Sequence, residues 1–179
     1  MRRSAGASRL RRTSPENAQG EYYLTDVVEV LASAGYLVAT MLVDDAEEAL
    51  GINDRVQLAA AEAVLRRRTA DGWLRAGVTM VDPDRISIDT TVRLGKDVTL
   101  FPGTLLQGET VIGDHAEIGP DTRLVDCVVG AGSRLEQVVG RDAEVGDDAT
   151  VGPFAVLEPG SQIPSGARTG AFYTAIADD

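Results

Sequence analysis

The apolar positions between Ile86 and Thr169 recur every six residues. One column is aliphatic, and the position two residues before it is small or β-branched. The aliphatic column is Ile88, Leu94, Leu100, Leu106, Ile112, Ile118 and Leu124; it resumes at Val129 and Leu135 after a slip of one residue, and at Val139, Val145, Val151, Leu157 and Ile163 after a slip of two. Thr169 closes the series. A period of six fits neither a helix nor an ordinary alternating strand.

This period predicts a three-sided prism in which short parallel strands alternate with tight corners and three hexads complete one coil. The aliphatic residue fills the prism and the small residue fits under the corner. Glycine, which often follows the aliphatic residue, supplies corner geometry that side chains resist. We therefore predict a hexapeptide-repeat parallel β-helix. Its left-handed coil is opposite to the usual rule for parallel crossovers, so the hand rests on similarity to known hexapeptide proteins.

The residues before the repeat predict an α/β segment. A helix should begin near Thr25 and end before Gly35, and residues 36–43 should form a strand. Residues 44–50 should be a loop or a short helical turn. A long helix capped by Asn53 or Asp54 should follow and end between Arg68 and Arg75. Its buried side should comprise Val56, Ala60, Ala63 and Val64.

Four regions follow from these patterns. They are a disordered basic arm (1–15), the α/β segment (16–83), the β-helix (84–172) and a C-terminal tail (173–179). The α/β segment is too small to bury a good core alone, so it should pack on the β-helix, on another subunit or on protein that is missing. The tail should cap the last coil, with Phe172 and Tyr173 covering it.

Charge and composition restrict the classes of partner that the protein can bind. The net charge is −11, and five arginines lie in the first twelve residues, so the remainder carries about −16. An acidic body argues against nucleic acid as the main partner. Cys127, the only cysteine, falls in the small-residue column and should be a buried filler. The sequence has neither an apolar run of membrane-spanning length nor a signal peptide, which favours a cytoplasmic protein with no membrane contact.

Four motifs occur in a specific order: "ENAQGEYYLTDVV" (16–28), "GINDRVQLAAAE" (51–62), "LRAGVTMVDPDR" (74–85) and "VGPFAVLEPG" (151–160). They resemble the bifunctional N-acetylglucosamine-1-phosphate uridyltransferase/glucosamine-1-phosphate N-acetyltransferase family, which makes UDP-N-acetylglucosamine for bacterial cell walls. The resemblance implies the C-terminal segment of a sugar nucleotidyltransferase domain joined to a β-helix. It also implies assembly as a homotrimer, with UTP and N-acetylglucosamine-1-phosphate as substrates.

The sequence departs from this family at both ends. The family's glycine-rich loop, catalytic Arg and Lys, and metal-binding Asp should precede Glu16, and they are not in the chain. The family's later coils, with the catalytic histidine and the acetyl-CoA site, are also not in it. We therefore expect a shortened β-helix and assign no catalytic residue.

Asn53 is the one site residue that the resemblance carries over. It implies that Asn53 binds both the nucleotide and Mg²⁺, the cofactor of an intact site, which prefers hard oxygen ligands. The residue type alone favours a helix N-cap instead. Because the partner aspartate is not in the chain, Asn53 alone should hold Mg²⁺ poorly.

Other positions have a functional and a structural interpretation. Glu21, Tyr22, Tyr23, Thr25 and Asp26 could form a wall of the sugar pocket, or a helix cap with tyrosines packed on a sheet. Glu158 and Ile176 stand where the resembling family has an arginine and a lysine that contact substrate, and Phe172 matches the family. A carboxylate repels phosphate, so we do not expect acetyltransferase activity.

The corner positions also contain residues that could carry chemistry. His115, in "IGDHAE", could serve as a general base, but its corner position predicts a surface residue. The same holds for Asp114, Asp121, Asp147 and Asp148, since aspartate suits turns through local hydrogen bonds.

Three functional hypotheses remain. The first is part of a UDP-N-acetylglucosamine pyrophosphorylase that is inactive without the missing nucleotide-binding half. The second is a non-catalytic β-helix that acts as a trimerisation or interaction module. The third, a free-standing hexapeptide acyltransferase, is the weakest because the expected His, Lys and Arg are not present. An upstream nucleotidyltransferase half would favour the first hypothesis over the second.

Overall fold

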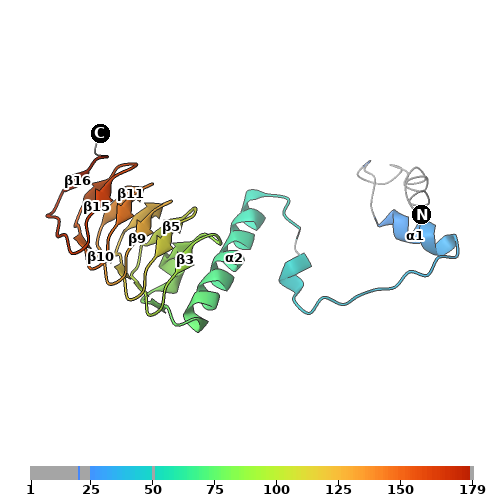
Figure 1. Ribbon diagram of the computed structural model, residues 1–179. Helices are drawn as coiled ribbons and strands as arrows, with labels where there is room; N and C mark the ends of the chain where they lie inside the picture. Colours follow the sequence, from blue (N-terminus) through green and yellow to red (C-terminus); the bar gives the residue numbers. More distant parts are fainter. Residues whose placement is uncertain (1–19, 21–24, 50, 178–179) are drawn as a thin grey trace, which may run out of the picture. The chain divides into compact units, whose positions relative to one another are not determined.

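The computed structural model describes residues 20, 25–49 and 51–177. The basic arm and Glu21, Tyr22 and Tyr23 lie outside the described residues. The described residues up to 49 and those from 51 onward belong to two separate units, and each unit is described by itself (Figure 1). Among the described residues, no helix combines the length and the apolar character that crossing a membrane requires.

The first unit contains helix α1 (Asp26–Ser33) and the 3₁₀ turn η2 (Ala46–Ala49). Both agree with the sequence predictions. Gly35 follows α1 with φ 75°, a left-handed conformation that glycine adopts without strain and that commonly ends helices. The prediction of a strand over residues 36–43 is wrong for the chain on its own. These residues form no strand and are exposed, because no described neighbour supplies a ladder of backbone hydrogen bonds.

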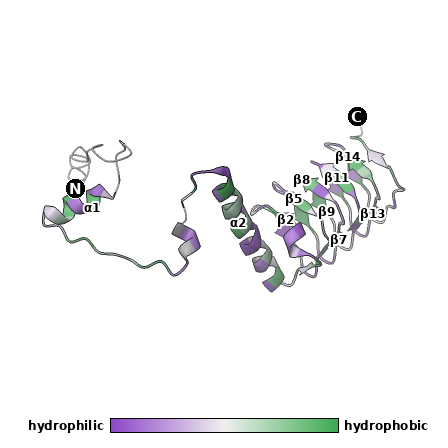
Figure 2. Cartoon of the chain, turned by 180° about the vertical axis from the view of Figure 1, so that it is seen from behind, coloured by the Kyte–Doolittle hydropathy of each residue, from purple (hydrophilic) through white to green (hydrophobic). Residues whose placement is uncertain are grey.

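Helix α2 (Arg55–Arg75) opens the second unit and reaches the end that the pattern predicts. The prediction of which side of this helix is buried is wrong. Val56, Ala60 and Ala63 are exposed, and polar and apolar residues alternate along the helix (Figure 2). The helix buries Ala70 instead, and it contacts strand β2 (Ser87–Ile88) and the 3₁₀ turn η3 (Pro83–Arg85).

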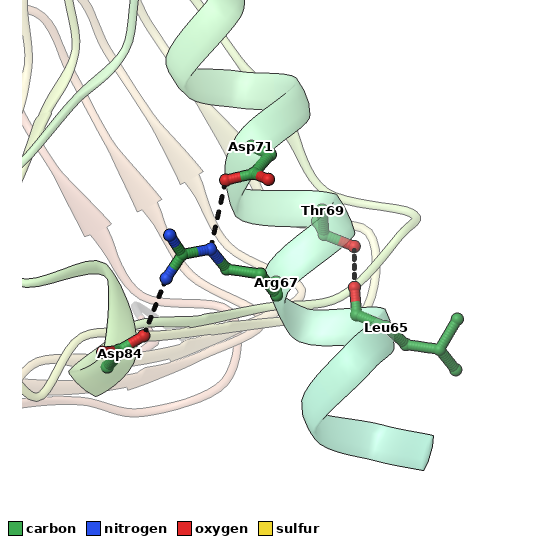
Figure 3. A network of polar contacts seen from close by, with 5 residues as sticks. All are labelled: Leu65, Arg67, Thr69, Asp71 and Asp84. Atoms are coloured by element: carbon green, nitrogen blue, oxygen red, sulfur yellow. Dashed lines mark hydrogen bonds and ion pairs between the residues drawn. The ribbon is translucent and has the colours of Figure 1, made fainter. Parts of the chain in front are cut away.

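Arg67 links α2 to the turn that leads into the β-helix. Its Nε lies 3.3 Å from Asp71 Oδ1 on the same helix, and its Nη1 lies 3.1 Å from Asp84 Oδ1 (Figure 3). On the same helix, the Thr69 hydroxyl donates to the Leu65 carbonyl at 3.1 Å. The ion pairs are exposed, and each contributes at most about 1 kcal/mol to the stability of the fold.

The rest of this unit is a left-handed parallel β-helix of about five turns with three sheets. Sheet A consists of β1 (Thr79–Met80), β4 (Thr99–Leu100), β7 (Glu117–Ile118), β10 (Arg134–Leu135) and β13 (Thr150–Val151). Sheet B consists of β2 (Ser87–Ile88), β5 (Leu105–Gln107), β8 (Arg123–Val125), β11 (Val138–Arg141), β14 (Ala155–Leu157) and β16 (Thr174–Ala175). Sheet C consists of β3 (Arg93–Leu94), β6 (Val111–Ile112), β9 (Val128–Val129), β12 (Glu144–Val145) and β15 (Gln162–Ile163).

The paired strands extend beyond both ends of the predicted 84–172 range. Strand β1 already pairs with β4, and β16 pairs with β14. The tail therefore continues the ladder of sheet B. Phe172 does not cover the end of the coil as expected; it is exposed and stacks on Phe154, with ring centroids 5.1 Å apart.

The predicted aliphatic column fills the prism. Leu106 and Leu124 pair across neighbouring coils, and neither side chain reaches solvent. Backbone groups satisfy the buried hydroxyls of the small-residue column except that of Ser161, which has no hydrogen-bond partner among the described residues. Ser133 Oγ, for example, donates to the Gly146 carbonyl at 2.7 Å and accepts from the Ala149 N–H at 3.0 Å. Apolar filling together with satisfied polar groups is what a stable interior requires.

The aliphatic column differs from the prediction at one place. Val139 is 54% exposed, whereas Val138 and Gly140 face inward. Gly140 pairs with Leu124 on one side and with Leu157 on the other, so it occupies the interior column. The correction follows from the pleat, because neighbouring side chains on a strand point to opposite faces.

Other side chains fill the space that Gly140 leaves in the interior. A Cβ atom on Gly140 would lie 3.0 Å from Leu124 Cδ2 and 3.3 Å from Cys127 Sγ. Cys127 is buried, which confirms its predicted role as a filler.

The corners contain residues with positive φ that align from coil to coil. His115, Asp121 and Asp148 have φ of 60°, 49° and 53°, as expected of corner residues. Asp114 and Asp147 occupy the adjacent corner position and accept hydrogen bonds from the backbone of the coil below. The Lys96 N–H donates to Asp114 Oδ1, and the Ala131 N–H donates to Asp147 Oδ1, both at 2.8 Å.

Candidate functional site

Asn53 lies in an exposed loop directly before α2. Asp54, not Asn53, caps this helix, because its Oδ1 accepts from the Gln57 N–H at 2.7 Å. Gln57 reaches back, and its Oε1 accepts from the Asn53 N–H at 2.6 Å. The two bonds resemble a capping box and fix the loop. The N-cap interpretation of Asn53 is therefore wrong, whereas its role as a ligand stays a prediction.

The donor set near Asn53 does not by itself fit Mg²⁺. The ion takes oxygen ligands in octahedral geometry and is usually bound through one or two carboxylates together with phosphate oxygens. The neighbouring carboxylate, Asp54, is already engaged in the cap. Within the described ranges, no three His, Cys, Asp or Glu side chains are grouped so that they could hold a metal. We therefore derive no catalytic step through a metal.

The polar–aromatic cluster at the start of α1 is described only in part. Thr25 occupies the N-cap position, but its side chain makes no capping hydrogen bond, and Asp26 begins the helix. An acidic side chain in the first turn is favourable for the helix dipole. Because the two tyrosines of this cluster lie outside the described residues, the sugar-pocket interpretation stays a prediction.

The structure brings Glu158 and Ile176 together, although they are far apart in the sequence. Strands β14 and β16 pair Leu157 with Ala175, and the Glu158 N–H donates to the Ala175 carbonyl at 3.0 Å. The next register position therefore places Glu158 beside Ile176, and both are exposed. These are the two positions where the resemblance implies basic residues. A carboxylate beside an aliphatic side chain offers an anionic phosphate no attraction.

Phe154 is a residue of this region that the sequence reasoning missed. It stacks on Phe172 with 15° between the ring planes, and both residues have positive φ, 59° and 61°. Bulky residues rarely adopt this conformation, so a corner pattern based on Gly, Asn and Asp does not select them. The sequence did contain a signal for this stack: Phe154 and Phe172 are one coil apart, and both occupy corner positions.

His115 and Cys127 lie where the sequence predicts them. His115 Nδ1 lies 3.8 Å from Asp97 Oδ2, in a pair whose side chains are both mostly exposed, which confirms the predicted surface position. The Cys127 thiol is buried and donates to the Val125 carbonyl at 3.4 Å. Burial raises the pKa of this thiol, so the reactive thiolate is disfavoured.

A concavity of about 380 Å³ lies over sheet A, apart from the residues discussed above. Phe101, Pro120 and Thr150 contribute to its lining. Across its floor Arg134 Nη2 lies 3.1 Å from Glu117 Oε1. The arginine is already neutralised by this pair. None of the site residues predicted from the sequence lines this concavity.

Comparison with known proteins places these features in context. No protein-family model matches the sequence. The Bifunctional protein GlmU of Corynebacterium efficiens is 48% identical over 165 residues, which cover 92% of this chain and 34% of that protein. The protein of the same name from Mycolicibacterium vanbaalenii is 49% identical over 170 residues, or 94% of this chain and 35% of that protein.

Among solved structures, a hexapeptide transferase family protein from Anaplasma phagocytophilum is 21% identical. The match covers 56% of this chain and 74% of that chain, with a TM-score of 0.34. At so low a score the likeness carries no argument, and the fold description rests on the ladders above. The identities to the GlmU proteins are much higher. The chain is therefore similar to GlmU proteins over about nine-tenths of its own length, and it spans about one third of the length of these bifunctional relatives.

Proposed function

We propose that this chain is part of an N-acetylglucosamine-1-phosphate uridylyltransferase, a UDP-N-acetylglucosamine pyrophosphorylase of bacterial cell-wall precursor synthesis, and that it acts in the cytoplasm. The observation that carries the proposal is the 48% identity over 165 residues to a bifunctional GlmU protein. Because the chain spans about one third of such relatives, we also propose that these residues do not catalyse uridylyl transfer alone. Cradling the triphosphate and aligning the sugar phosphate act as one unit, and part of the unit gives little rate.

In this proposal Asn53 contacts the nucleotide. The bonds among Asn53, Asp54 and Gln57 support the assignment, since they hold the loop in one conformation before α2 without engaging the Asn53 side-chain amide. An unengaged side-chain amide can donate a hydrogen bond to a nucleotide phosphate.

The test is uridylyl transfer measured from UTP and N-acetylglucosamine-1-phosphate in buffer containing Mg²⁺. The chain alone should form no UDP-N-acetylglucosamine. Co-expression with the part of the C. efficiens GlmU protein that precedes the matched residues should restore product. Asn53→Ala should then lower the rate at least about tenfold, as expected for a lost polar contact to a charged group. Gln162→Ala, at the exposed position of β15, is the control and should have no effect. Unchanged turnover in Asn53→Ala would refute the assignment.

A second candidate is a non-catalytic trimerisation or interaction module. It is favoured by the outer face of sheet B, where Val139 of β11 and Val156 of β14 pair and are exposed, and where Leu105 of β5 is exposed beyond Arg123 of β8. An apolar patch of this kind on a solenoid favours association. We propose a homotrimer that buries this face. Light scattering at tens of micromolar protein should give the trimer mass, and Leu105→Glu combined with Val156→Glu should reduce it. A trimer that never restores uridylyl transfer with the added half would favour this candidate.

A further inference from the structure

Gln57, the third residue of helix α2, makes a hydrogen bond that the capping of the helix does not require. The cap is already made, since Asp54 Oδ1 accepts from the Gln57 N–H at 2.7 Å. In a capping box the side chain of this third residue returns to the N–H of the cap residue. Here Gln57 Oε1 reaches past the cap and accepts from the N–H of Asn53, one residue earlier, at 2.6 Å. The bond therefore fixes a residue outside the helix.

This bond is what holds the backbone of Asn53. Among the residues that the structure describes, Gln57 is the only hydrogen-bond partner of Asn53. Gly51 and Ile52, the described residues directly before it, have none in that part of the chain, and residues 51–54 are exposed. Packing does not restrain an exposed residue, so without the Gln57 acceptor the Asn53 backbone would sample more conformations.

The arrangement separates a candidate ligand from its support. The Asn53 side-chain amide is not engaged, whereas the Gln57 side-chain oxygen is used on the Asn53 backbone. A side chain that contacts a reacting substrate has to be held to within about 0.5 Å of its productive position, and residues behind the contact supply that restraint. Gln57 stands in this supporting position relative to Asn53.

We propose that Gln57 is a positioning residue for uridylyl transfer, which acts through Asn53 by holding its backbone so that the side-chain amide meets the nucleotide. This inference rests on the proposed function, because it takes Asn53 as a nucleotide contact. Gln57 itself does not touch the substrate. Its loss should therefore cost less activity than the loss of Asn53, and it should cost nothing further once the Asn53 side chain is gone.

The test is a double-mutant cycle in the full chain, co-expressed with the part of the C. efficiens GlmU protein that precedes the matched residues. The readout is kcat/KM for UTP. Gln57→Ala should lower kcat/KM about three- to tenfold, as expected for a lost hydrogen bond. Added to Asn53→Ala, it should lower kcat/KM by no more than about 1.5-fold further. A residue that only supported the helix would lower kcat/KM by the same factor in both backgrounds, and that result would overturn the inference.

Two further variants test the hydrogen bond itself. Gln57→Glu keeps an acceptor oxygen, so kcat/KM should recover to within about threefold of the parent complex. Gln107→Ala is the matched control, because Gln107 Oε1 also accepts one hydrogen bond, from Arg123 Nε at 2.9 Å, but on strand β5. It should leave kcat/KM unchanged. No recovery in Gln57→Glu, or an equal loss in Gln107→Ala, would contradict the assignment.

Amide hydrogen exchange gives a readout that is independent of activity. In the chain alone, the Asn53 N–H should exchange at least about fivefold faster in Gln57→Ala than in the parent chain or in Gln57→Glu. Equal exchange in all three chains would show that Gln57 does not hold the Asn53 backbone, and the inference would fail.

The outcomes separate this inference from the proposed function. An active parent complex that Gln57→Ala leaves unchanged would refute the positioning role and leave the proposed function standing. A parent complex that binds UTP but forms no UDP-N-acetylglucosamine would refute the proposed function, and the same cycle, measured as the Kd for UTP, would then decide the positioning role. A parent complex that neither binds UTP nor forms product would refute both.

Discussion

The neighbouring valines of strand β11 offer a direct test of the register of the β-helix. Val138 is 0% exposed and Val139 is 54% exposed. Truncation of either side chain to alanine removes the same two methyl groups, and Val138 pairs with Ala155, so alanine suits this column. The structure therefore predicts a large effect at Val138 and a small one at Val139.

The magnitude at Val138 follows from burial. Each buried methyl contributes about 0.8 kcal/mol, so the transfer loss is about 1.6 kcal/mol. The cavity left behind brings the cost in unfolding free energy to about 2–3 kcal/mol. Val139→Ala should cost about 0.5 kcal/mol or less, as is usual for surface substitutions.

Urea unfolding followed by circular dichroism measures both variants. With a slope of about 2 kcal/mol/M, the midpoint of Val138→Ala should fall by about 1 M and that of Val139→Ala by about 0.25 M or less. Val145→Ala is the control, since Val145 is interior in either register and should behave like Val138→Ala. Any loss at Val139 through assembly would depend on protein concentration, so two concentrations separate the causes. A larger loss at Val139 than at Val138 at both concentrations would refute the register.

Three further predictions concern the corners, the cysteine and the last coil. Gly113→Ala should destabilise the fold by about 1–3 kcal/mol, because its Cβ would lie 2.6 Å from the Ala131 backbone nitrogen, whereas Gly170→Ala, with open space around it, should be neutral in the same urea assay. The Cys127 thiol should react with an aromatic disulfide reagent at pH 8 only after unfolding, because it is buried. Burial raises the pKa of Cys127 in the folded protein above that of the unfolded chain. The resulting contribution to the free energy of unfolding is therefore present below the unfolded pKa and is lost as pH rises towards the folded pKa. A chain bearing Glu158 and Ile176 should form no product from acetyl-CoA and glucosamine-1-phosphate above a heat-killed control, and product formation would contradict the charge argument.

The sequence by itself determined the kind of fold and most of its interior. The six-residue period predicts the prism, the aliphatic column from Ile88 to Leu124, and corners occupied by residues such as His115 and Asp121. These features are local, since each hexad repeats the same strand and corner and each corner demands the same backbone geometry. The motifs also pointed to the GlmU proteins to which this chain is similar.

The tertiary structure decided what depends on pairing between distant residues. Val138 and Val139 are equally plausible as interior residues in the sequence, and only the ladder that joins Gly140 to Leu124 and Leu157 selects Val138. The same ladders stack Phe154 on its neighbour and place Glu158 beside Ile176. Residues 36–43 show the converse case, in which strand-forming residues form no strand because no described segment pairs with them. A strand is completed by its neighbours, so its own residues are not sufficient to form it.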